Sequence, residues 1–225
     1  MGRRTQEGET LEQYKQRMID PISESYCAAK WYNATIWLGH GQTASCHHPP
    51  GHWIPLEELK DNYTAIHNTK HKKLMRKYMQ EGKRPAECEY CWKVEDMGKN
   101  HVSDRTFKTE IFKDEDIHKS AEMPWDENVM LRTLEISFDR ACNFSCSYCN
   151  PAFSTAWVKD INTYGGYQNI QSDGRGHFVD TADWAKPAAK HEEDNPYIQA
   201  FHKWWDNGLA DNLEEIRITG GEPIM

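Results

Sequence analysis

Hydrophobic and polar positions alternate most clearly in the second half of the chain. Residues 131–138 (LRTLEISF) alternate with a period of two, which predicts a strand, and residues 213–219 (LEEIRIT) predict a second one. Between them, residues 152–164 and 196–207 have the pattern of helices. Because the order is strand, helix, strand, we expect a parallel α/β unit, with the Gly-, Asp- and Gln-rich residues 165–195 as an insertion or mobile loop.

The first 125 residues have fewer regular patterns. Residues 10–20 and 68–82 predict helices, and another helix is expected to start at Ser103. Residues 26–54 have the Gly, His and Pro density of an irregular metal-binding knuckle, and the acidic residues 114–125 predict a linker. In the helix at 68–82 we expect the basic side chains to lie on the solvated face. The opposite, apolar stripe would consist of Leu74, Met75, Tyr78 and Met79.

Composition and charge narrow the classes of function. The 225 residues include 35 acidic and 27 basic ones, and the net charge of −8 argues against a nucleic-acid partner. Nine Trp and ten Tyr are too many for a disordered chain. The N-terminus has no apolar core of a secretory signal, and no stretch approaches the roughly 18 apolar residues of a membrane span. We therefore expect a cytoplasmic protein with no membrane partner.

The seven cysteines are an odd number, which does not suit a closed set of disulfides, and in a reducing cytoplasm clustered cysteines favour metal ligation. Cys142, Cys146 and Cys149 form the pattern CxxxCxxC directly after the first predicted strand. Three thiolates on a short loop suit a [4Fe–4S] cluster and leave one iron open for a substrate or cofactor. A zinc loop or free thiols are the alternatives, but zinc would need a fourth ligand, and only the amides of Asn143 and Asn150 are near.

A strand followed by CxxxCxxC, with Tyr148 just before the last cysteine, resembles the radical S-adenosylmethionine (radical SAM) superfamily. The second predicted strand runs into Thr219-Gly-Gly-Glu-Pro223, which is similar to the glycine-rich motif of that superfamily and lies at the expected place in the chain. The two motifs together, each at the end of a predicted strand, carry the resemblance.

The resemblance implies a role for each matching position. The three cysteines of the loop would hold a [4Fe–4S] cluster, whose open iron would chelate the amino and carboxylate groups of S-adenosylmethionine (SAM). Gly220, Gly221 and Glu222 would contact the methionine amino group, because glycines allow close approach of the backbone and a carboxylate suits an ammonium group. Tyr148 would either pack, shield the cluster or contact adenine. An electron from a donor such as flavodoxin or ferredoxin would cleave SAM to a 5′-deoxyadenosyl radical.

The remaining cysteines resemble the cluster-binding pattern of SPASM and twitch domains, which carry auxiliary iron–sulfur clusters in many radical SAM enzymes. The resemblance rests on a GxxxxC segment at 41–46 and a CxxC pair at 88–91, although such domains usually follow the barrel rather than precede it. Four thiolates could hold one iron–sulfur cluster or a closed zinc site. The proposed ligands are Cys27, Cys46, Cys88 and Cys91. Three nearby histidines are expected to be solvated or to support the ligands rather than replace one: His47, His48 and His52.

The predicted architecture is α/β, with residues 1–125 as a small loop-rich α+β cysteine-cluster domain. Residues 126–225 would then form the start of a partial (β/α)6 radical SAM barrel. A complete barrel needs further strands, so we expect the N-terminal portion of a longer enzyme, or a chain completed by a second one, with little SAM cleavage by these residues alone. The resemblance implies a peptide or protein substrate. The alternative is a non-catalytic zinc or iron–sulfur module for binding or electron transfer.

Overall fold

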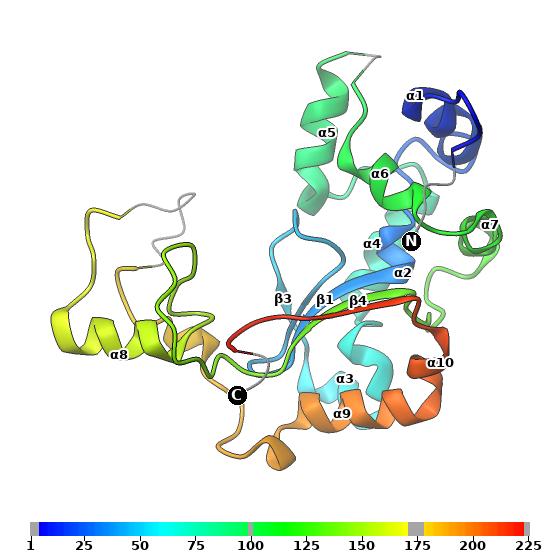
Figure 1. Cartoon of the computed structure of the whole chain (residues 1–225). Coiled ribbons are helices and arrows are strands. Elements are labelled where there is room, and N and C mark those ends of the chain that lie inside the picture. The colour runs from blue at the N-terminus through cyan, green and yellow to red at the C-terminus, as the bar shows by residue number, and fades with distance from the viewer. Residues whose placement is uncertain (1–4, 99–100, 171–177, 223–225) are drawn as a thin grey trace.

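The computed structural model describes residues 5–98, 101–170 and 178–222. Its centre is a five-stranded sheet with the order β3-β2-β1-β4-β5 (Figure 1). The strands are β1 (Asn33–Trp37), β2 (Gln42–Ala44), β3 (His52–Trp53), β4 (Thr133–Ser137) and β5 (Glu215–Ile218).

The sheet is mixed and open. β4 pairs in parallel with β1 on one side and with β5 on the other, whereas β2 runs antiparallel to both β1 and β3. The strands predicted at 131–138 and 213–219 are confirmed as β4 and β5, and so is their parallel pairing. The strands that the structure describes do not close into a barrel. β5 lies at one edge, where Ile216 and Ile218 are exposed.

One face of the sheet packs on α9 (Pro196–Trp204), the helix predicted at 196–207. Asn195 caps this helix by accepting hydrogen bonds from the backbone N–H groups of Tyr197 and Ile198. Trp204 is fully buried, and each large apolar side chain buried in this way contributes about 1.5–3 kcal/mol to stability. The core of this layer includes Ala34, Ile36, Leu134, Ile136, Tyr197, Ile198, Phe201 and Trp204.

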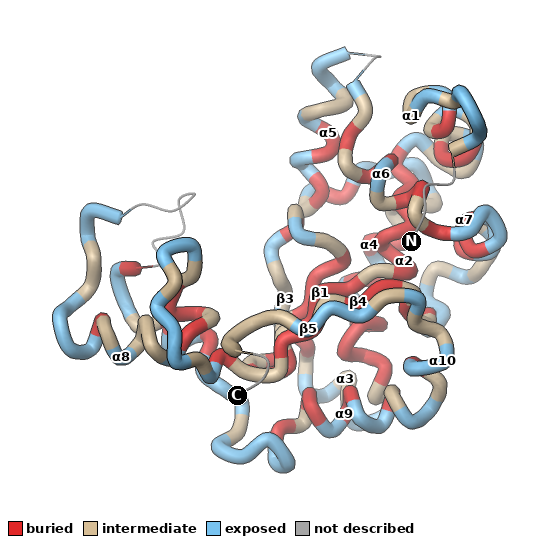
Figure 2. Tube along the Cα trace, viewed as in Figure 1, coloured by how far each residue is buried: buried red, intermediate tan, exposed pale blue. Residues whose placement is uncertain are grey.

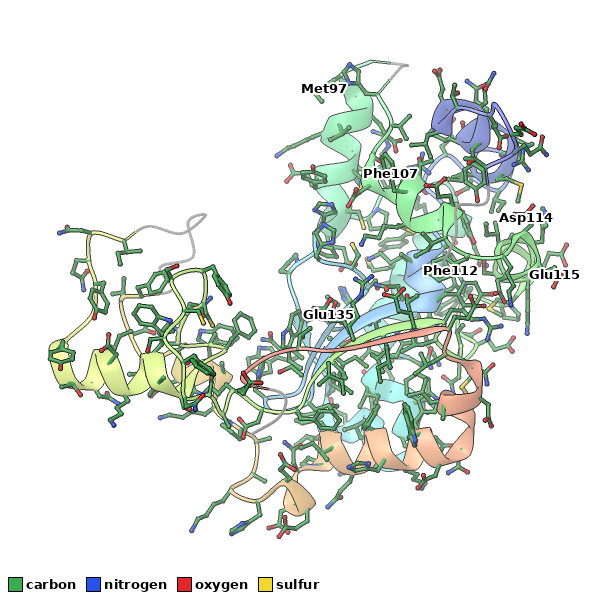
Figure 3. The ribbon with its side chains drawn as sticks, viewed as in Figure 1. Met97, Phe107, Phe112, Asp114, Glu115 and Glu135 are labelled. Atoms are coloured by element: carbon green, nitrogen blue, oxygen red, sulfur yellow. The ribbon has the colours of Figure 1, made fainter. Side chains whose placement is uncertain are left out.

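The opposite face of the sheet is polar. Alternation along β1, β4 and β5 places Thr35, Glu135 and Arg217 in one row across the three strands. Figure 3 shows Glu135 rising from β4 on the side of α6 (Asp104–Glu110) rather than toward α9. These polar residues line a shallow pocket together with Cys46 and Lys108. This face therefore borders the region that contains the N-terminal cysteines.

The first 130 residues build a second hydrophobic core around Tyr14, Trp31 and Phe112, visible as the buried segments in the upper part of Figure 2. A capping box of Thr10 and Gln13 starts the first helix, which continues as a π-helix through Lys15–Ile19. The helices around this core are α1 (Leu11–Tyr14), α2 (Ala29–Tyr32), α4 (Lys70–Gln80), α5 (Glu89–Asp96), α6, and α7 (Asp114–Glu122). Short segments connect them: α3 (Leu56–Asp61) and 3-10 turns at Tyr63–Ile66 and Ala86–Cys88.

Two predictions for this part are wrong. Residues 26–54 are not an irregular knuckle, because they contain α2 and the strands β1, β2 and β3. Residues 114–125 are not a linker, because three acidic residues in the first turn favour the helix dipole and α7 forms there. One sheet thus draws strands from both sides of the boundary predicted between residues 125 and 126.

The helix predicted at 68–82 is confirmed as α4, and Thr69 caps it by accepting a hydrogen bond from the N–H of Lys72. The prediction of a solvated basic face is wrong for two of its residues, because Lys72 and Arg76 are almost completely buried. Lys72 donates to Thr43 Oγ1 (2.7 Å) and Ala44 O (2.9 Å). Arg76 donates to Lys30 O (3.0 Å) and to Asn68 Oδ1 (3.1 Å), while Leu74, expected in the apolar stripe, is exposed.

The remaining helices lie in the second half of the chain. The helix predicted at 152–164 is α8 (Thr155–Tyr164), which the side chain of Ser154 caps. The described parts of 165–195 contain only 3-10 turns, at Asp183–Ala185 and Glu192–Asp194. After α9, an irregular turn at Trp205–Leu209 and the short α10 (Ala210–Asn212) lead into β5. None of the helices in the described residues is long and apolar enough to cross a membrane.

Candidate metal centres

The three-cysteine loop leaves the end of β4 and is fixed to the start of α8. The backbone N–H of Cys142 donates to Thr155 Oγ1 (3.0 Å), and this hydroxyl donates back to Cys142 O (2.9 Å). Trp157 Nε1 donates to Cys146 O (3.0 Å) from the next turn of the helix. All three cysteines of the loop remain half-buried, so their sulfurs are accessible. The loop is therefore held by its backbone while its thiols stay available to a metal.

A buried arginine supports the base of this loop. Arg140 lies directly before it, and its guanidinium donates to the carbonyl oxygens of Pro151 (3.0 Å), Thr181 (3.1 Å) and Ala182 (3.1 Å). Its exposed fraction is only 7%. Since these acceptors come from segments on either side of α8, Arg140 connects the loop to the chain that returns after the helix. Sequence patterns alone did not reveal this role.

The glycine motif after β5 packs directly on the base of the same loop. The N–H of Gly221 donates to Phe153 O (3.0 Å), and the N–H of Glu222 donates to Ala141 O (2.8 Å), the residue before Cys142. Gly220 and Gly221 have φ values of +77° and +57°. A Cβ at Gly220 would lie 2.0 Å from Ser137 Oγ, and one at Gly221 would lie 2.3 Å from Ala141 O. Only glycine fits at both positions.

A small pocket opens where these two segments meet. Its walls come from the ends of the parallel strands β4 and β5, at the edge of the sheet where open α/β folds bind ligands. Glu222 lines this pocket together with Gly220, whereas Pro223 lies outside the described residues. Tyr148 does not line it. The Tyr148 side chain is 90% exposed, and a hydrogen bond with Cys146 raises the pKa of its hydroxyl. Packing in a core is therefore not its role.

We expect Gly221→Ala to weaken SAM binding by about tenfold or more, because the new Cβ would push the Ala141 carbonyl and the adjoining Cys142 out of place. The measurement is a SAM titration of the anaerobic protein followed by EPR or calorimetry. Gly165→Ala is the matched control, since Gly165 also has a positive φ (+86°) but a Cβ there would meet nothing within 4 Å. Equal affinities in the two variants would contradict the role in SAM binding that the resemblance implies for Gly221.

The four remaining cysteines, which come from three separate segments of the chain, line one cavity. Cys27 precedes α2, Cys46 follows β2, and Cys88 and Cys91 lie at the start of α5. Three of them are buried and Cys46 is half-buried. Burial, followed by the proximity of the other three thiols, raises the pKa of Cys27 to about 12. Figure 1 shows α5 and α6 at a distance from α8, the helix that follows the three-cysteine loop.

The spacing of the sulfurs bears on which metal group would fit. Zinc–sulfur bonds of about 2.3 Å in a tetrahedron place thiolates about 3.8 Å apart, whereas a cubane cluster binds each thiolate to a different iron and spaces them more widely. Among the described residues, no trio of cysteine sulfurs lies mutually within 4.8 Å. In neither cysteine set, therefore, do three sulfurs lie at the spacing that a bound zinc ion would give.

Charged groups that the sequence analysis missed surround the four-cysteine cavity. Lys30 and Arg105 both line it and are each only 2% exposed. Lys30 forms an ion pair with Glu87, and Arg105 forms one with Glu95 (2.6 Å). Burial disfavours the ammonium, but Cys88 and Glu87 raise the pKa of Lys30 above its ordinary value. Burial also raises the pKa of the Cys88 thiol to about 11, although the charge and a hydrogen bond of Lys30 oppose that rise.

The nearby histidines form contacts with one another and with an acid. His48 Nε2 lies 2.8 Å from Asp104 Oδ2, and His47 Nε2 lies 3.4 Å from the same oxygen. The ring of His48 also stacks on Tyr90, with centroids 3.8 Å apart. His52 is hydrogen-bonded to Thr69 Oγ1 (3.0 Å). These contacts fix the segment that follows Cys46.

Comparisons with known proteins give no assignment. No protein-family model matches the chain, and no curated protein and no solved structure shows significant similarity to it. The functional conclusion therefore rests on the residues and on their arrangement.

Proposed function

We propose that this chain is a radical SAM enzyme in which Cys142, Cys146 and Cys149 hold a [4Fe–4S] cluster. A second cluster would be held by Cys27, Cys46, Cys88 and Cys91. The observation that carries the proposal is the hydrogen-bonded contact between the Gly220-Gly221-Glu222 segment and the base of the three-cysteine loop. Two motifs separated by about seventy residues meet at the end of adjacent parallel strands, where a cofactor bound by one would touch the other.

Each part of this site has a separate task. The loop presents three thiols from a backbone that Thr155 and Trp157 hold in place. The glycines let the backbone approach the bound cofactor closely, and the Glu222 carboxylate would accept hydrogen bonds from its ammonium group. A bound cluster would supply the electron that cleaves the sulfonium of SAM and yields methionine and a 5′-deoxyadenosyl radical. The residues around the loop would position the bound cofactor.

The substrate and partners extend the same proposal. The polar face of the sheet, with Glu135 and Arg217, borders Cys46 of the second site, so a substrate held there would lie beside the auxiliary cluster. A peptide or protein substrate is the class that the resemblance implies, and flavodoxin or ferredoxin would serve as electron donor. A further chain segment or a second chain could cover the exposed edge of β5.

The test is a metal analysis combined with EPR of the anaerobically purified chain. Two clusters predict about eight iron and eight sulfide per chain. Addition of SAM should change the EPR spectrum of the reduced protein, because SAM would bind the open iron of the first cluster. About four iron with one zinc would assign zinc to the four-cysteine site. Iron without any response to SAM would favour the non-catalytic electron-transfer module instead.

A further inference from the structure

The side chain of Lys30 lies at the four-cysteine cavity, where its charge would act on a metal group bound by the cysteines. Lys30 belongs to α2, three residues after Cys27, and lines the cavity with all four cysteines. Its side chain is almost completely buried, and its carbonyl oxygen accepts a hydrogen bond from the Arg76 Nε (3.0 Å). A lysine in such a place is uncommon, since an ammonium group loses its hydration there. Its burial requires a compensating negative charge.

Glu87 supplies part of this compensation and fixes the direction of the side chain. It is the residue directly before Cys88, and one of its oxygens pairs with the Lys30 ammonium. The other oxygen lies 2.6 Å from His71 Nε2 at the surface. The ammonium is therefore held between a carboxylate and the cavity rather than free to turn to solvent.

The basic side chains in the lining of the cavity are Lys30, Arg105 and Lys108, and Asp104 is the carboxylate in the same lining. Arg105 is paired with Glu95, and Lys30 is paired with Glu87. A cluster bound by four thiolates is negatively charged, and the buried ammonium group of Lys30 would lie close to it.

Resting on the proposed auxiliary cluster, we propose that Lys30 is a positioning residue that raises the reduction potential of this cluster, and that Glu87 partly offsets its effect. Reduction adds one negative charge to the cluster. A fixed ammonium beside the Cys88 ligand stabilises the reduced form, because hydrogen bonds and charge near the sulfurs set the potential of such clusters. The pair would keep the auxiliary cluster reducible although it is buried.

The experiment measures the potential of the auxiliary cluster by EPR-monitored redox titration of the full chain. Alanine at Cys142, Cys146 and Cys149 removes the other signal. In this background, Lys30→Met should shift the ratio of reduced to oxidised cluster at least tenfold toward the oxidised form, about 59 mV for a one-electron couple. Glu87→Gln should shift it in the opposite direction. Lys113→Met is the matched control, since it removes an exposed lysine paired with Glu214 (3.1 Å).

Shifts of the reduction potential in opposite directions in Lys30→Met and Glu87→Gln would support an electrostatic role. A change in packing alone would not reverse the direction of the shift between the two variants. An unchanged potential in Lys30→Met, or the same shift in Lys113→Met, would overturn the inference. If the Lys30→Met variant does not retain iron, the Glu87→Gln variant tests the inference by itself. An unchanged or lower reduction potential of the auxiliary cluster in Glu87→Gln would then overturn the inference. Zinc or no metal in the wild-type four-cysteine site would instead reject the proposed auxiliary cluster, together with the inference that rests on it.

Discussion

Alanine at Cys142, Cys146 and Cys149 together should abolish the response to SAM and remove about half of the iron, with about four iron per chain remaining. The physical reason is the separation of the two cysteine sets. The three cysteines of the loop are half-buried and belong to neither of the two large hydrophobic cores. Their sulfurs can therefore be removed without leaving a cavity in a core, and the fold should persist.

The measurements are iron and sulfide content, the EPR spectrum with and without SAM, and circular dichroism. Ser147→Ala is the matched control, because it changes an exposed side chain in the same loop and should leave both the iron and the response to SAM unchanged. Loss of all the iron in the triple variant would show that the division of the cysteines into three and four is wrong. A SAM response that survives in the triple variant would place the open iron at the other site.

Local patterns were sufficient to predict the second half of the fold. β4, α8, α9 and β5 all follow from segments whose periodicity is clear, and the parallel pairing follows from their order. The strands β2 and β3 were missed because they are only three and two residues long, and all three strands of this part lie in or beside a segment rich in Gly, His and Pro. Their stability comes from pairing, above all that of β1 with β4, and a contact between residues about one hundred positions apart leaves no local signal.

For the candidate site, the sequence predicted the cysteines but not the charged residues around them. Both cysteine sets were identified from spacing, and the structure places all four N-terminal cysteines at one cavity. The charged residues around that cavity were not identified. Lys30 lies in the apolar run Cys27-Ala-Ala-Lys-Trp-Tyr32, and a charge in such a run was a signal that could have been used. Lys72 and Arg76 offered less warning, because a basic helix is most often solvated.

Three histidines, His67 fully buried and His40 and His52 half-buried, lead to a second large effect, which concerns stability in mild acid. His67 is fully buried, and burial, followed by the charges of Lys72 and Arg76, holds its pKa well below the ordinary value of 6.5. Burial, and then Lys72, lowers the pKa of His52 to about 3, and burial lowers that of His40 to about 4. All three are therefore neutral in the folded chain between pH 7.5 and 5.5, whereas in the unfolded chain they gain protons as the pH falls through 6.5.

Because the unfolded state binds more protons in this range, the free energy of unfolding should fall as the pH falls. Each histidine contributes up to about 1.4 kcal/mol per pH unit below 6.5, and we expect a total loss of about 4 kcal/mol between pH 7.5 and 5.5. Carboxylates with lowered pKa values act mainly below this window, since they are protonated in the unfolded chain only near pH 4. The measurement is urea unfolding of the anaerobic protein at the two pH values.

The variant His67→Gln separates the effect of histidine protonation on the free energy of unfolding from the other effects of acid. Glutamine does not titrate, so the variant should lose about a third of the pH dependence even though its stability at pH 7.5 is also lower. His202→Gln, at an exposed position on α9, is the matched control and should keep the full dependence. A slope in His67→Gln equal to that of the wild type would mean that burial and the charges of Lys72 and Arg76 do not keep His67 neutral in the folded chain.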